Sequence, residues 1–203
     1  MPNLFSAFTS EVFRPLVTLL IPGAIAISTW FIALLWQFPV LKKTVYDNHA
    51  ETGFVLALAM TFAGMVLEDL GTRVEKRLDD KRDDKTGNHN ANWFAYLRTA
   101  FVTDPIGRRY IRTLVLRLKF ELGAGFAMLF AALGILWLWY LGLSYQAALI
   151  NLGICGALAI WLFVEACSTH KTLADNHANL LGEIRIIPTL SGSTATTSKP
   201  SDP

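Results

Sequence analysis

The sequence predicts an all-α integral membrane protein, a four-helix bundle with both termini inside and a helical cytoplasmic segment between spans 2 and 3. The first observation is a run of 43 residues between Glu121 and Glu165 without a charged side chain. A helix rises about 1.5 Å per residue and the bilayer hydrocarbon core is about 30 Å thick, so this run holds two crossings with a turn near Gly142. The second observation is composition. The chain is 53% hydrophobic with a mean hydropathy of +0.39, and its 17% charged residues must be segregated into loops.

Two further spans are expected in the first third of the chain. No residue between Arg14 and Lys42 is charged, which leaves enough helix for a tilted crossing. A second charge-free run, 52–67, is at the short edge of what spans, so Glu68 is expected at the headgroup boundary or inside the bundle. The expected spans are 15–38, 50–70, 121–141 and 146–167.

Lysine and arginine are distributed unevenly about these spans. The first 14 residues, the segment 68–121 and the tail hold 16 of the 18 basic residues, and only Lys42 and Lys43 lie on the other side. The positive-inside rule therefore predicts a multi-pass inner (plasma) membrane protein with both termini cytoplasmic. Five parts are expected: a transmembrane hairpin (1–67), a charged cytoplasmic helical segment (68–120), a second hairpin (121–167), a short amphipathic helix (168–187) and a disordered tail (188–203).

The charged segment is expected to begin as an extension of the second span. Opposite charges at helical spacing run from Glu68 to Lys85, and the Gly and Asn residues of 86–90 are expected to end that helix. Basic and apolar residues then alternate toward the third span, which is typical of a juxtamembrane helix. Anchoring to anionic lipid headgroups is the favoured interpretation, and docking of an acidic protein or a nucleic-acid backbone is the alternative, although direct nucleic-acid contact is not expected. The contact candidates are Trp93, Arg108, Arg109, Arg112, Arg117 and Lys119.

One face of the second span carries small and polar residues at steps of three and four. The members that fall within the span are Gly53, Ala57, Thr61 and Gly64. Small residues allow helix backbones to approach closely in lipid, so this face predicts a helix interface within or between subunits, and a homo-oligomer sharing it is expected. The alternative is a water-accessible path whose mouth is marked by Glu68 and Glu75.

Acidic residues gather at the cytoplasmic ends of the spans. The topology places Glu68, Glu121 and Glu165 at one depth, and with Glu75 they form a candidate polar mouth. Either they pair with neighbouring Arg and Lys residues in a structural layer, which is the favoured account, or they guard a cation path.

No familiar catalytic, nucleotide-binding or zinc motif occurs in the sequence, so no catalytic, cofactor-binding or metal-binding residue is assigned. The tetrapeptide Asp-Asn-His-Ala occurs twice, but the topology separates His49 from His177, and chance repetition is favoured. A lipid enzyme would have to use His170, His177 and Glu165. The preferred function is a non-catalytic, oligomeric membrane component whose charged segment binds a partner protein or signal; a small cation channel or transporter is the alternative.

Overall fold

A computed structural model describes the chain over residues 13–86 and 106–191, with side chains described for 18–84 and 110–176. In these ranges the chain forms five helices and no strands: α2 (Phe13–Gln37), α3 (Pro39–Asp47), α4 (His49–Thr86), α6 (Ile106–Tyr140) and α7 (Tyr145–Ser191). The all-helical fold is therefore confirmed within the described residues. Four of the helices, all but α3, are long and apolar enough to cross a membrane.

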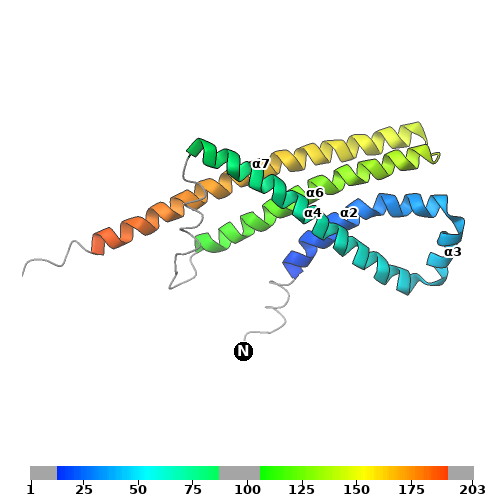
Figure 1. The fold of residues 1–203 in the computed structure, drawn as a ribbon, viewed down its shortest axis with the longest axis horizontal. Coiled ribbons are helices and arrows are strands. Elements are labelled where there is room, and N and C mark those ends of the chain that lie inside the picture. The colour runs from blue at the N-terminus through cyan, green and yellow to red at the C-terminus, as the bar shows by residue number, and fades with distance from the viewer. Residues whose placement is uncertain (1–12, 87–105, 192–203) are drawn as a thin grey trace, which may run out of the picture.

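Helices α6 and α7 form a long antiparallel hairpin (Figure 1). The turn between them is tight because Gly142 adopts a positive φ of 109°, a conformation that costs glycine little. The amide of Leu143 then donates back to the carbonyl of Leu138 at 2.9 Å, which satisfies a carbonyl at the end of α6. The turn near Gly142 that the sequence indicates is where the hairpin closes.

Helix α2 packs against both α6 and α4, and α3 joins α2 to α4 at one end of the molecule (Figure 1). The charged end of α4, the start of α6 and the last turns of α7 lie at the opposite end. We call these the α3 end and the charged end. Helices α4, α6 and α7 therefore present their charged extensions on one side of their apolar parts.

Two buried clusters hold the helices together. The cluster nearer the charged end joins α6 to α7, and consists of Ile111, Leu114, Leu118, Leu122, Ala166 and Leu173. The second joins α2, α4 and α6 through Ala26, Leu67 and Ala127. Leu118 and Leu122 are almost fully buried, so α6 is the central helix of the bundle.

Large apolar side chains cover much of the outer surface. Phe54 and Phe62 on α4 are 67% and 70% exposed, and Ile160 and Trp161 on α7 are 68% and 59% exposed. In water such a surface would be an aggregation liability, whereas in a bilayer it is the ordinary lipid-facing surface. The surface and the four long apolar helices together indicate a membrane protein.

Three differences from the expected elements concern helix continuity. Helix α3 was not expected; Phe38, in an extended conformation, separates it from α2, and Pro39 begins it. The third span is one helix with the preceding basic segment, since α6 starts at Ile106. Helix α7 continues through 168–187, which was expected to be a separate helix, because no glycine or proline interrupts the chain at the end of the fourth span.

Candidate functional site

The candidate site is a layer of ion pairs where the apolar parts of α4, α6 and α7 give way to their charged extensions. One pair joins α4 to α6: Lys119 Nζ donates to Glu68 Oε1 at 2.8 Å. Both side chains are partly exposed, at 36% and 39%. A pair in this setting contributes modestly to stability, and it links α4 to α6.

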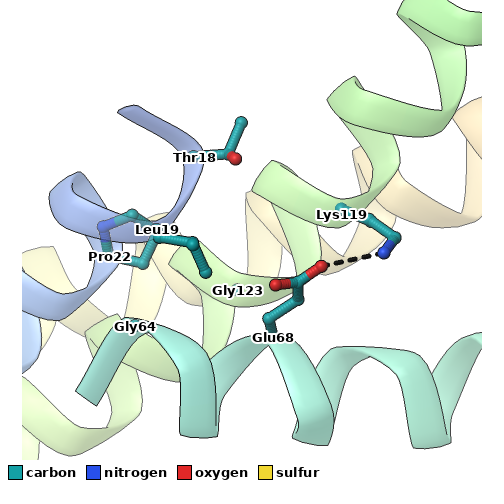
Figure 2. Close-up of a pocket in the computed structure, with 7 residues that line it drawn as sticks. All are labelled: Thr18, Leu19, Pro22, Gly64, Glu68, Lys119 and Gly123. Atoms are coloured by element: carbon teal, nitrogen blue, oxygen red, sulfur yellow. Dashed lines mark hydrogen bonds and ion pairs between the residues drawn. The ribbon is translucent and has the colours of Figure 1, made fainter. Parts of the chain in front are cut away.

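A small cavity lies beside this ion pair (Figure 2). Its volume is about 10 Å³, and it is lined by Thr18, Leu19, Pro22, Gly64, Glu68, Lys119 and Gly123. A space of this size holds about one water molecule, and the carboxylate and ammonium would give such a water polar partners. The cavity is too small for an organic ligand.

Arg117 connects α6 to α7. Its Nε donates to Glu121 Oε1, one turn along the same helix, at 2.6 Å, and its terminal nitrogen pairs with Glu165 on α7. Glu121 is 5% exposed, and its Oε2 is buried with no hydrogen-bond partner among the described residues. Two carboxylates thus share one guanidinium, and the buried one depends on it for compensation of its charge.

Two further contacts join α4 to α7 farther along the charged end. His170 Nε2 lies 2.7 Å from Asp79 Oδ1, and His170 is 7% exposed. Arg82 pairs with Asp175 one turn beyond. Glu75, on the same helix as Asp79, is partly buried within range of the charges of Asp79, Lys119 and His170. The extension of α4 is therefore fastened to both other helices.

The four residues of the expected polar mouth do not form one ring. Glu121 and Glu165 are brought together at Arg117. Glu68 pairs instead with Lys119. Lys119 lies two positions after Arg117, and side chains two positions apart on a helix point in different directions. Glu75 lies two turns farther along α4, toward Asp79.

The expected interface residues of α4 have different surroundings. Gly64 is buried: a Cβ there would lie 2.1 Å from the carbonyl oxygen of Leu19, so α4 and α2 are in backbone contact. In contrast, Gly53 has nothing within 4 Å of its Cβ position and Ala57 is exposed. Thr61 donates its hydroxyl hydrogen to the Ala57 carbonyl of its own helix at 2.8 Å. Within one chain, only Gly64 of these four forms a tight seam.

Sequence reasoning missed two features of this layer. Gly23 is the partner of Gly64 in the seam, since its Cβ position lies 1.8 Å from the carbonyl oxygen of Met60. The position four residues after Gly23 is Ile27, so the four-residue spacing of small side chains seen on α4 does not recur there. The spacing of Asp79 and Arg82 predicted only pairs within their own helix, whereas in the structure they contact His170 and Asp175 of α7.

The basic contact candidates are only partly described. Trp93 lies outside the described residues, and the side chains of Arg108 and Arg109 lie outside them too, as does that of His177. Arg112 is exposed. Arg117 and Lys119 are engaged in ion pairs, which leaves less of their charge for a lipid or a partner.

The described side chains contain no group of three or more His, Cys, Asp or Glu residues arranged to hold a metal ion. No protein-family model, curated protein or solved structure matches the chain. The function is therefore argued from the geometry of the ion-paired layer and the surfaces around it.

Proposed function

We propose that this chain is a non-catalytic inner-membrane protein whose charged end binds a cytosolic protein partner and couples that binding to the apolar bundle. The observation that carries the proposal is the continuity of α4, α6 and α7 from apolar to charged sequence. The 38 residues of α4 extend about 57 Å, well beyond a hydrocarbon core of about 30 Å. A force applied to the charged end would therefore reach the apolar part through unbroken helix.

Polar contacts between the helices support this coupling. Glu68 holds α4 to α6, and Asp79 and Arg82 hold α4 to α7. A partner that displaced any of these contacts would change how the extension of α4 sits on its neighbours. The layer is thus suited to transmit a docking event.

The exposed surface of the α4 extension supports the choice of a protein partner. Both signs of charge are interspersed along it, including Arg73, Lys76, Arg77, Asp80, Lys81 and Asp84, all of them exposed. Mixed charge of this kind suits a complementary protein surface, whereas binding to a nucleic-acid backbone requires a predominantly basic one. The distribution of basic residues supports a cytoplasmic location for this surface and both termini.

An oligomer completes the proposal. Gly53 and Ala57 form an open small-residue pair on α4 that a second copy could approach closely.

The cation-channel alternative is less favoured, because Glu68, Glu121 and Glu165 are each ion-paired and the cavity beside Glu68 has room for about one water molecule.

Photocrosslinking in intact membranes tests the proposal. A photoreactive residue at Lys76 or Lys81, on the charged surface, is expected to capture a discrete soluble protein, and the charge reversal Arg77→Glu is expected to weaken that capture. The same residue at Phe62, exposed on the apolar part of α4, is the matched control and should capture lipid. Equal capture at all three positions would contradict the proposal.

A second measurement tests the coupling. Spin labels at Leu58 and Ile154, exposed on α4 and α7, report the distance between the apolar parts of these helices. Partner binding is expected to change that distance, and His170→Leu, which removes the contact with Asp79, is expected to reduce the change while leaving binding intact. An unchanged distance, together with a cation flux in liposomes that Glu68→Gln abolishes, would favour the channel instead.

A further inference from the structure

An open groove lies at the α3 end, where the last turns of α2 meet the beginning of α3. Its volume is about 500 Å³, and it is lined by Ile32, Leu35, Trp36, Pro39 and Lys42. The groove exists because the extended backbone of Phe38 turns the chain and Pro39 starts a new helix in another direction. The apolar side chains at the end of α2 are consequently left uncovered on that side.

The lining combines an apolar floor with one cation. Ile32 and Trp36 are 50% and 57% exposed, although both are large apolar residues. Lys42 is exposed, and neither it nor Lys43 forms an ion pair with any described residue. A hydrocarbon chain would fit the floor, and an anionic group would fit the ammonium at the edge.

The position of the groove indicates where such a molecule comes from. The floor belongs to α2, one of the helices apolar enough to cross a membrane, and the cation lies just past its end. Tryptophan side chains cluster near this end of α2. The ring centroids of Trp30 and Trp137 are 6.5 Å apart, and Trp36 lines the groove itself. Tryptophans concentrate where hydrocarbon meets headgroups, so the groove spans that boundary.

We propose that this groove is a binding site for one anionic phospholipid of the surrounding leaflet, with an acyl chain along Ile32 and Leu35 and the phosphate group at Lys42. Basic pockets between transmembrane helices on the cytoplasmic side of membranes bind anionic headgroups through this combination of apolar contact and charge, and this groove offers the combination at the opposite side. This site is separate from the charged end and does not depend on the function proposed for it. A zwitterionic lipid would gain the same apolar contact but less from Lys42.

Native mass spectrometry of the full-length protein, titrated with phosphatidylglycerol or phosphatidylcholine in detergent, tests the site. The wild type is expected to retain one phosphatidylglycerol more strongly than phosphatidylcholine. Lys42→Gln should lower phosphatidylglycerol affinity about fivefold, the factor that corresponds to one basic residue near a membrane surface. Lys43→Gln is the matched control, because Lys43 neighbours Lys42 on α3 but does not line the groove, and it should have no effect.

A second variant tests the apolar floor. Leu35→Trp fills the groove without changing charge, and it is expected to reduce the retention of both lipids while helix content stays unchanged by circular dichroism. Equal effects of the two lysine variants, equal retention of the two lipids by the wild type, or full retention by Leu35→Trp would each overturn the proposal.

Discussion

The contact between Gly64 and α2 allows a sharp test of how the bundle is held together. A Cβ at position 64 would lie 2.1 Å from the carbonyl oxygen of Leu19, whereas an ordinary contact is at least 3.4 Å. The obstacle is backbone, which has no rotamer to adopt, so Gly64→Ala forces α2 and α4 apart by about 1.3 Å. Overpacking of this kind costs about 1–3 kcal/mol, and we expect the variant to be less stable by that amount.

The same helix supplies the control. Gly53 has nothing within 4 Å of its Cβ position, so Gly53→Ala meets no obstacle. Alanine is the better helix former by up to about 1 kcal/mol, and this variant should be unchanged or slightly more stable. The two substitutions are chemically identical and differ only in what the new methyl group meets.

Reversible unfolding in mixed micelles, followed by circular dichroism and at a dilution that keeps the chain monomeric, measures both variants. The expected order of stability is Gly53→Ala, wild type, Gly64→Ala. A Gly64→Ala variant within about 0.5 kcal/mol of wild type, the range of a neutral surface change, would refute the close approach of α2 and α4.

Three other expectations concern the ion-paired layer, the topology and the hairpin turn. Arg117→Gln leaves the buried Glu121 without its cation and should lower the free energy of unfolding by about 1–3 kcal/mol, and adding Glu121→Gln should restore part of the loss in the same unfolding assay. A membrane-impermeant maleimide should label the exposed Cys167 only after cells are permeabilised, whereas Lys43→Cys, in a background without native cysteines, should react in intact cells; the reverse pattern would invert the proposed orientation. Gly142→Ala places a side chain at a φ of 109° and should cost about 1–3 kcal/mol in thermal unfolding, while a result at wild-type stability would mean that the turn relaxes.

Long apolar runs made most of the helices predictable. The first span was expected at 15–38, and α2 covers Phe13–Gln37. The second span was expected at 50–70, and α4 covers His49–Thr86. Helix α3 was missed because it is only nine residues long, which is too short for a helical period to stand out in the sequence.

The arrangement of the charged layer was harder to anticipate. Sequence placed Glu121 and Glu165 at a similar depth, but their sharing of Arg117 depends on how α6 and α7 are rotated, which depth does not determine. Likewise, His170 and Asp79 are 91 positions apart, and no local pattern connects them.

The spacing of small residues assigned four positions of α4 to one face, but it did not indicate what each of them contacts. Packed helices generally cross at an angle, so a continuous face meets its neighbour over only a few turns. Gly64 lies inside that short contact and Gly53 lies outside it. A period in the sequence therefore identifies the side of a helix that can pack, and the crossing angle decides which residues do.

The backbone contact at Gly23 and Gly64 has a mechanical consequence. It holds α4 at an interior point, between the stretch that carries Phe54 and the stretch that carries Asp79. A stiff helix held at an interior point pivots about that point, so a sideways force on one end of α4 moves the other end in the opposite direction. Gly23 and Gly64 would then act as the pivot, and the ion pairs to α6 and α7 would set the force needed to move α4.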